Sequence, residues 1–270
     1  MVAAPLLELH VWGEPAVVAR RLGPHTRFLA AVGPSDLVRW RRAARAPLPP
    51  TCLGFHFEGP YLNPAMAGAL DRRAIKPRVR LRELAALIAA DRGRVRMMTI
   101  APELPGALVA IRWLRRHGIV VSLGHTDATY AQAKRAIDAG ATSATHLFNR
   151  MRPWHHREPG VIGAILDDER VSAQLILDGV HVHPAACRWA MRVAGPRRII
   201  LTTDAAIDAV RAQRLTRRGQ GYYTSEETLA GSALTLPRAI RHAVTWAGVS
   251  PTQARAMAST NPARLLGPTS

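Results

Sequence analysis

The sequence Gly54-Phe55-His56-Phe57-Glu58-Gly59-Pro60-Tyr61-Leu62-Asn63-Pro64 is typical of a β-strand that runs into a tight loop. Because strand side chains alternate, Phe55 and Phe57 fall on one face while His56 and Glu58 fall on the other. A buried carboxylate costs several kcal/mol unless a partner or a metal ion neutralises it. The place of Glu58 at the end of this strand therefore calls for a cation or a strong hydrogen-bonding partner.

Eight such strands are predicted along the chain, and helical patterns follow several of them. The strands are residues 6–12, 27–32, 52–58, 95–101, 120–125, 142–148, 172–178 and 198–204. The helices that follow them are residues 35–44, 81–90, 104–117, 128–139 and 183–193. Alternation of this kind indicates parallel strands joined by crossover helices. Eight units within about two hundred residues predict an α/β fold, a (β/α)8 barrel of the TIM type.

Polar and capping residues set the expected ends of the remaining elements. Asp127 is predicted to cap the helix over residues 128–139, and Gly140 to end it. A polar, arginine-rich loop is predicted over residues 206–228. Two helices follow, over residues 233–247 with Ser232 as the cap and over residues 251–259. The whole chain, residues 1–270, is predicted to be a single domain.

The charge of the chain bears on its partners. The formal net charge is +18, which is typical of proteins that bind nucleic acid. However, only Lys76 and Lys134 of the 37 basic residues are lysines, and the arginines are spread over the whole chain. This pattern indicates a coding bias rather than a binding surface. We therefore expect anionic small molecules, and not nucleic acid, as partners.

Nothing in the sequence predicts a membrane partner or export. No apolar run is long enough to span a bilayer, and residues 1–7 lack the charged region of a secretory signal. Cys52 and Cys187 lie inside apolar patterns, which is typical of core thiols in a reducing compartment. We therefore expect a cytoplasmic protein.

Five ionisable or metal-binding side chains stand at the ends of five predicted strands. Catalytic groups of a barrel lie at the carboxyl ends of its strands. The residues are Glu58, His125, His146, His181 and Asp204. Two imidazoles and one carboxylate with an open fourth position form the ligand set of a catalytic zinc-type site. A further aspartate nearby could act as a general base.

Each of these residues taken alone has a structural interpretation. A histidine at a strand end more often makes a structural hydrogen bond than it binds a metal. The shared placement of all five is what favours one site. His56 is interpreted as a partner that orients Glu58 rather than as a ligand, and both alternatives stay open.

Nine motifs occur in a fixed order from about residue 52 onward. They are GFHFEGPYLNP (54–64), TIAPE (99–103), SLGHTDATY (122–130), ATSATHLFNRM (141–151), REPGVIGAILDD (157–168), ILDGVHV (176–182), LTTDA (201–205), LAGSALTL (229–236) and NPARLLG (261–267). In content and order they resemble the N-acetylglucosamine-6-phosphate deacetylase family of the amidohydrolase superfamily. Before residue 50 the resemblance is limited to residues 6–13.

The resemblance implies hydrolysis of the acetamide of N-acetylglucosamine 6-phosphate to glucosamine 6-phosphate and acetate. It implies that Glu58, His125 and His146 bind one divalent metal ion, usually zinc, and that Asp204 is the acid/base. It also implies a pocket for a phosphorylated amino sugar, with His181 and Arg157 holding the substrate, including its phosphate, either within one chain or across a dimer interface. The residues implied in substrate binding are Ala69, Asn149, Arg150, Arg157, His181, Leu229, Ala230 and Gly231.

Four departures from the family pattern bear on activity. The family carries a carbonyl-polarising histidine where this chain has Leu70, and loss of such a donor costs about 10²–10³-fold in rate. The first strand carries His10-Val11-Trp12 instead of His-x-His, so a second metal is not expected. Arg150 replaces a small residue and could narrow or recharge the sugar pocket. The barrel is expected to lack the accessory β-sandwich domain of the family.

These departures leave three functions open. The chain is a minimal deacetylase, a deacylase of a related N-acyl sugar or amide, or a metal-bearing protein that binds a phosphosugar with weakened catalysis. The complete set of metal ligands together with Asp204 favours an enzyme. The sequence also leaves open whether the chain is a monomer or a homodimer.

Overall fold

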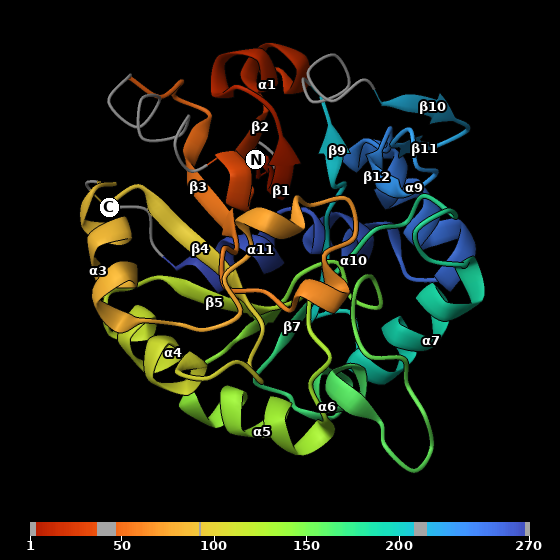
Figure 1. Cartoon of the computed structure of the whole chain (residues 1–270). Coiled ribbons are helices and arrows are strands. Elements are labelled where there is room, and N and C mark those ends of the chain that lie inside the picture. The colour runs from red at the N-terminus through yellow and green to blue at the C-terminus, as the bar shows by residue number, and fades with distance from the viewer. Residues whose placement is uncertain (1–3, 37–46, 92, 208–214, 268–270) are drawn as a thin grey trace. The chain divides into compact units, whose positions relative to one another are not determined.

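The computed structural model describes residues 4–36, 47–91, 93–207 and 215–267 of the chain (Figure 1). Their internal contacts define two compact units. The first unit holds Met1–Ala31, Leu48–Leu53 and Ala173–Ser270, and the second holds Val32–Pro47 and Gly54–Ser172. Both units combine parallel strands with helices, which confirms the predicted α/β class. That the whole chain is one domain stays a prediction.

Parallel strands form the sheet of the second unit, in the order β3-β4-β5-β6. Their bounds are β3 (Cys52–Glu58), β4 (Val95–Ile100), β5 (Val120–Leu123) and β6 (Ser143–Ala144). The pairing aligns their carboxyl ends, because Glu58 lies opposite Thr99 and Thr99 lies opposite Ser122. Side chains that follow these strands therefore gather at one edge of the sheet.

Helices follow the strands of the second unit in succession (Figure 1). They are α3 (Leu81–Ala89), α4 (Ala107–Arg116), α5 (Tyr130–Ala139) and α6 (Gly160–Asp167). Helix α4 buries Ala107, Ala110, Ile111 and Leu114, which share one face at helical spacing. Short 3₁₀ turns also occur, at Pro34–Asp36, Pro64–Met66 and Arg72–Ala74.

The predicted start of α5 is wrong by two residues. Thr129, not Asp127, caps the helix, and it forms a capping box with Gln132. Asp127 is engaged elsewhere, because its carboxylate forms an ion pair of 2.9 Å with Arg152. Gly140 ends the helix as predicted.

Helix α6 was not predicted from the sequence. Val161, Ile162, Ala164, Ile165 and Leu166 are all buried, so the helix has no polar stripe that would reveal its period. A short apolar run of this length is equally compatible with a buried strand. Only its packing, mainly against α5, decides the conformation.

Three strands end at least three residues earlier than predicted. The strand expected over residues 142–148 is limited to Ser143–Ala144, because the backbone turns left-handed at His146 and Phe148, with φ angles of 33° and 78°. Those expected to end at residues 178 and 204 stop at Leu175 and Leu201. The functional residues thus lie in loops just beyond the strands.

In the first unit, consecutive strands pair in the order β10-β11-β12-β9-β1-β2, so β1 lies between β9 and β2. The strands are β1 (Leu6–Trp12), β2 (Thr26–Val32), β9 (Ala205–Ala206), β10 (Thr216–Arg218), β11 (Gly221–Tyr223) and β12 (Leu229–Ser232). Strand β1 is parallel to β2 and β9, whereas β11 runs antiparallel to both β10 and β12. Two further parallel strands pair with each other, β7 (Ser172–Leu175) and β8 (Ile199–Leu201).

The described part of the first unit also contains helices. They are α1 (Pro15–Leu22), α7 (Pro184–Ala194), α9 (Leu236–Ala247), α10 (Pro251–Met257) and α11 (Thr260–Leu266). Helix α1 was not predicted. The helix expected over residues 35–44 falls mostly on residues 37–46, which lie outside the described residues.

The loop predicted over residues 206–228 is wrong in part. Within it, β10 and β11 form a hairpin in which Arg218 lies opposite Gly221, so only two residues make the turn. Gly219 begins that turn with a φ of 58°, a conformation that glycine adopts readily. Residues 208–214 of the predicted loop lie outside the described residues.

The predicted cap of α9 is also wrong. Ser232 is the last residue of β12, and its hydroxyl accepts a hydrogen bond from the backbone of Leu234. The helix begins only at Leu236, after Thr235. Pairing of β12 with β9 holds Ser232 in the sheet, which a local sequence pattern cannot reveal.

The two cysteines are buried and free, as predicted. Burial raises the pKa of the Cys187 thiol to about 12, so this side chain is an unreactive part of the core. Among the described residues, no helix is long and apolar enough to cross a membrane.

Candidate functional site: a metal-binding group and an aspartate–histidine cluster

Glu58, His125 and His146 come together at the carboxyl ends of β3, β5 and β6. Oε1 of Glu58 lies 3.1 Å from Nε2 of His125 and 2.9 Å from Nε2 of His146. One ligand atom from each residue lies within 4.8 Å of the other two, and all three side chains are buried. The parallel pairing of the strands produces this group from residues far apart in the sequence.

The chemistry of the donor set fits a divalent cation. Nδ1 of His125 lies 2.8 Å from the carbonyl oxygen of Met66, which can only accept, so Nδ1 carries the proton. In neutral His125 a lone pair at Nε2 then faces a carboxylate oxygen of Glu58. A divalent cation held by these acceptors would remove the conflict, and a glutamate with two histidines is a known catalytic zinc set.

Both histidines have a left-handed backbone, with φ angles of 48° for His125 and 33° for His146. This region is costly for residues other than glycine, typically by about 1–3 kcal/mol. Both residues lie just beyond strand ends. Such strain concentrates where a side chain must be aimed for function, which agrees with a ligand role.

A chain of buried polar side chains connects the strands that carry the metal-binding group. Nε2 of His56 lies 2.8 Å from Oγ1 of Thr99, which lies 2.8 Å from Oγ1 of Thr145. Thr145 in turn contacts Oγ of Ser122 at 2.7 Å. One residue comes from each of β3, β4 and β5, and Thr145 directly follows β6. His56 therefore ties neighbouring strands together and is not part of the three-residue group.

Asp204 is the centre of a second cluster, which lies within the first unit. Its Oδ1 accepts a hydrogen bond of 2.8 Å from Nε1 of Trp12, and Nε2 of His10 lies 3.4 Å from the same oxygen. Its Oδ2 faces Nε2 of His181 at 3.9 Å. The backbone of Asp204 is left-handed, with a φ of 51°. The contact with Trp12 was not predicted, although Trp12 and His10 share one face of β1.

Asp178 fixes the ring of His181. Its Oδ2 lies 2.6 Å from Nδ1 of His181, and its Oδ1 accepts hydrogen bonds from the backbone of Val180 and His181. Burial raises the pKa of Asp178, but the contacts with His181 and with the backbone outweigh it, so the pKa falls below its usual range. Ionised Asp178 therefore keeps a proton on Nδ1 and turns Nε2 towards Asp204.

Glu8 secures the loop that precedes Asp204. The side chain is buried, and burial raises its pKa. It accepts hydrogen bonds from Oγ1 of Thr202 at 2.5 Å and from the backbone of Thr203 at 3.0 Å. The sequence places Glu8 on the same strand face as His10, but only the structure reveals its partners.

The predicted Leu229-Ala230-Gly231 segment lies beside Asp204 in the first unit. The backbone N–H of Ser232 donates to the carbonyl oxygen of Asp204 at 3.0 Å. Gly231 has a φ of 144°, and a Cβ there would lie 3.1 Å from that same oxygen. Glycine thus allows the close approach of β12 to Asp204.

The remaining predicted substrate residues lie in loops of the second unit. Asn149 is half-buried, and its amide donates to the carbonyl oxygen of His146 at 3.1 Å. Arg157 and Ala69 are exposed. Arg150 lies over Gly68, where an added Cβ would be 2.5 Å from its Nε. These positions are compatible with the predicted roles, which stay predictions.

Leu70 belongs to a small apolar cluster. It packs against buried Leu62, Ala67 and Ile75, all from the segment that follows β3. The segment therefore has its own apolar core, and Leu70 contributes to it. The side chain of Leu70 cannot donate a hydrogen bond. Its role in the structure is packing.

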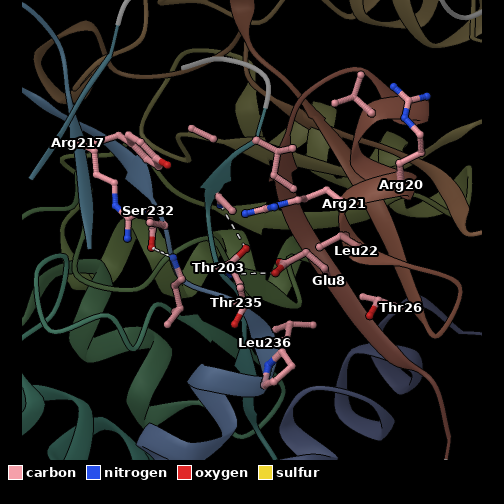
Figure 2. Close-up of a pocket in the computed structure, with 18 residues that line it drawn as sticks. Glu8, Arg20, Arg21, Leu22, Thr26, Thr203, Arg217, Ser232, Thr235 and Leu236 are labelled. Carbon is pink, nitrogen blue, oxygen red and sulfur yellow. Dashed lines mark hydrogen bonds between the residues drawn. The ribbon is translucent and has the colours of Figure 1, made fainter. Parts of the chain in front are cut away.

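A cavity of about 870 Å³ lies within the first unit (Figure 2). Figure 2 shows Glu8 pointing towards Thr203, with Arg21 and Arg217 at the cavity wall. None of the three metal-binding residues lines it, nor does Asp204. The cavity is thus distinct from the groups to which the sequence assigns the chemistry.

A family model described as the amidohydrolase family matches residues 18–269 of the chain. The chain belongs to the amidohydrolase family. It is 41% identical to the N-acetylgalactosamine-6-phosphate deacetylase of Escherichia coli O157:H7, covering 80% of this chain and 59% of that protein. It is 38% identical to the N-acetylglucosamine-6-phosphate deacetylase of Bacillus subtilis (strain 168), covering 80% and 56%. These relatives confirm the resemblance found in the nine motifs.

Solved structures of the family extend the comparison to nearly the whole chain. A point mutant of the N-acetyl-D-glucosamine-6-phosphate deacetylase of Mycobacterium smegmatis, in complex with N-acetyl-D-glucosamine-6-phosphate, matches with a TM-score of 0.85. The identity is 35%, and the match covers 98% of this chain and 77% of that chain. By contrast, the chain spans between half and three fifths of the length of the first curated relatives it matches.

Proposed function

We propose that the chain hydrolyses the acetamide of N-acetylglucosamine 6-phosphate to glucosamine 6-phosphate and acetate. The observation that carries the proposal is the convergence of Glu58, His125 and His146 in a chain whose relatives are named as deacetylases of N-acetyl amino-sugar phosphates. We further propose that the βα units close into one (β/α)8 barrel domain in the cytoplasm. The match over 98% of the chain supports the barrel.

Glu58, His125 and His146 would hold one divalent ion, with zinc as the first choice because of the donor set. When bound, such an ion polarises a carbonyl oxygen and lowers the pKa of water from 15.7 towards about 7. Asp204 accepts a proton from the attacking water at a carboxylate oxygen and later donates it to the leaving amine nitrogen. Its hydrogen bond with Trp12 orients the carboxylate for both transfers.

Substrate binding would fall to the residues that the family resemblance implies. Arg157 is exposed, and its guanidinium makes no ion pair among the described residues, so it can take the phosphate through two parallel hydrogen bonds. His181, oriented by Asp178, would contribute a donor. Asn149, Arg150, Ala69 and the Leu229-Ala230-Gly231 backbone would complete the sugar pocket.

A second candidate substrate is N-acetylgalactosamine 6-phosphate. The relative from Escherichia coli O157:H7 carries that name and is 41% identical to this chain. The two sugars differ at one hydroxyl group, so the choice depends on a few polar contacts in the pocket. Arg150, which is exposed beside Gly68, is a candidate to make one of them.

The test measures zinc content and acetate release on the purified chain. We expect about one zinc ion per chain after zinc-supplemented expression, and acetate release that disappears in Asp204→Asn. Both sugar phosphates are compared by kcat/KM, which identifies the preferred epimer. A chain that stays metal-free, or one that releases no acetate from either sugar, contradicts the proposal. Binding without turnover would favour the catalytically weakened alternative.

A further inference from the structure

Glu103 follows β4 in the second unit and belongs to neither cluster. Its Oε1 accepts a hydrogen bond from Nδ2 of Asn63 at 2.9 Å and another from the backbone of Asp127 at 2.8 Å. Its Oε2 accepts from Oγ1 of Thr126 at 2.5 Å. One half-buried carboxylate thus joins two loops that are far apart in the sequence.

The two loops are those that carry metal-binding residues. Asn63 follows Glu58 in the loop after β3, and Thr126 directly follows His125 after β5. The loops also meet directly, because the backbone N–H of Asn63 donates to the carbonyl oxygen of His125 at 2.9 Å. Glu103 therefore binds both loops at their contact point.

A path of hydrogen bonds and backbone runs from Glu103 to the ring of His125. Glu103 fixes the amide of Asn63, whose Oδ1 caps the Pro64–Met66 turn by accepting from Ala65 at 2.9 Å. The last residue of that turn, Met66, accepts the Nδ1–H of His125 at 2.8 Å. The direction of Nε2, the atom that would bind the metal, follows from this bond.

The partners of Glu103 are all neutral. Its three hydrogen bonds come from an amide, a backbone N–H and a hydroxyl, and it forms no ion pair among the described residues. A carboxylate accepts from all three donors at once, whereas an amide side chain accepts only at its oxygen and would have to donate to the Thr126 hydroxyl. The residue type thus matches the task of holding both loops.

We propose that Glu103 is a positioning residue that sets the affinity of the metal site by fixing the His125 ring. This inference rests on the proposed metal-binding role of Glu58, His125 and His146. It does not require that the bound substrate be an amino sugar. Glu103 does not touch the reacting atoms and acts through Asn63 and the Met66 carbonyl.

The test compares zinc dissociation constants, measured by competition with a chromophoric chelator, for the parent, Glu103→Ala and Glu103→Gln. We expect Glu103→Ala to weaken zinc binding by about 10–100-fold, the usual cost of losing a residue that orients a ligand. Glu103→Gln should lose less, because its amide oxygen can still accept from Asn63 and Asp127. Melting temperatures of the metal-free proteins separate affinity from folding.

Asp168→Asn serves as the matched control. Asp168 is a buried carboxylate of the same unit that contacts Lys134 at 2.6 Å and Arg170 at 2.8 Å. It holds no loop that carries a metal-binding residue. We expect this variant to melt at a lower temperature while its zinc dissociation constant stays at the parental value.

A coupling measurement adds a readout that general destabilisation would not change. If Glu103 and Asn63 act through one path, the double variant Glu103→Ala/Asn63→Ala binds zinc about as weakly as the weaker single variant. If the two losses of zinc affinity were fully additive, Glu103 and Asn63 would not act through one path.

The outcomes separate the inference from the proposed function. A parental zinc affinity in Glu103→Ala, or in Asn63→Ala should the Glu103→Ala variant not fold, overturns the inference and leaves the deacetylase proposal standing. Zinc binding by the parent without acetate release overturns only the proposed activity. A parent that binds no zinc overturns both.

Discussion

Nε1 of Trp12 donates a hydrogen bond of 2.8 Å to Oδ1 of Asp204, joining β1 to the loop after β8. The sequence pattern indicated only that Trp12 replaces a second histidine. In the structure it orients the proposed acid/base, and His10 packs edge-on against its ring at 5.4 Å between centroids. Trp12, which stands in place of the second histidine of His-x-His, thus supplies a hydrogen-bond donor to Asp204.

Trp12→Phe tests that contact. The ring is retained and the N–H is lost, so Asp204 loses a donor to a charged group, worth about 1.5–3 kcal/mol. We expect kcat/KM for acetate release to fall by about tenfold or more, with zinc content unchanged. Trp113→Phe is the control, because Trp113 stacks on His117 at the end of α4. Equal effects of both substitutions would contradict the proposed role.

Leu70→His tests whether the missing family histidine limits turnover. Leu70 packs against Leu62, Ala67 and Ile75, so an imidazole there loses apolar contact. We expect a melting temperature a few degrees lower and a gain in kcat well below the 10²–10³-fold value of a full carbonyl donor. Leu70→Met, which conserves volume, should keep the parental melting temperature. A gain of a hundredfold or more would show that packing does not decide the position.

Thr145→Val tests the series of buried hydroxyl groups formed by Thr99, Thr145 and Ser122. Oγ1 of Thr145 contacts both Thr99 and Ser122, so its removal leaves two buried hydroxyl groups short of a partner. We expect the free energy of unfolding in urea to fall by about 1–3 kcal/mol. Thr245→Val, on the exposed face of α9, should change it by less than about 0.5 kcal/mol. Equal values for the two variants would show that the chain of hydroxyl groups is not stabilising.

Asp91 should make stability depend on pH. Burial raises its pKa from 3.8 to about 6, so the folded chain holds a proton that the unfolded chain releases. The stabilisation is present below about pH 4 and is lost as the pH rises through 6, with a total of about 3 kcal/mol. In metal-free protein, Asp91→Asn should make the urea midpoint of unfolding depend less on pH between about pH 4 and pH 6.5. Parallel pH profiles for parent and variant would refute this assignment.

Removal of the metal should lower thermal stability. A bound ion at a free concentration of about 100 times its dissociation constant stabilises the folded state by about 2.7 kcal/mol. We therefore expect a chelator to lower the melting temperature, and added zinc to restore it. In Glu58→Gln the chelator should have little effect, because a ligand of the group is already lost. A chelator effect of parental size in that variant would place the metal elsewhere.

Much of the fold follows from local patterns in the sequence. Strand β3 was predicted with its bounds, since the alternation from Phe55 to Glu58 and the Gly59-Pro60 break are both local. The meeting of Glu58, His125 and His146 could also be predicted. Parallel strands align their carboxyl ends, and each of these residues stands at or just beyond such an end.

Some local features required the structure because distant partners compete for the same side chain. Asp127 is a good helix cap by type, yet Arg152 engages its carboxylate and Thr129 caps α5 instead. Ser232 has the residue type of a helix cap, yet β9 holds it in β12. Both errors come from contacts that no nearby sequence pattern encodes.

The α/β class, the family and the residues of the candidate metal site could all be inferred without coordinates, because side-chain period, strand ends and motif order are properties of the sequence. Three relationships appeared only in the folded molecule: Trp12 orients Asp204, Leu70 packs into the loop after β3, and Glu103 joins the loops around His125. The first and the third join residues far apart in the sequence, whereas Leu70 packs against residues of its own segment. A hydrogen bond between residues far apart in the chain exists only once folding has brought its donor and acceptor together.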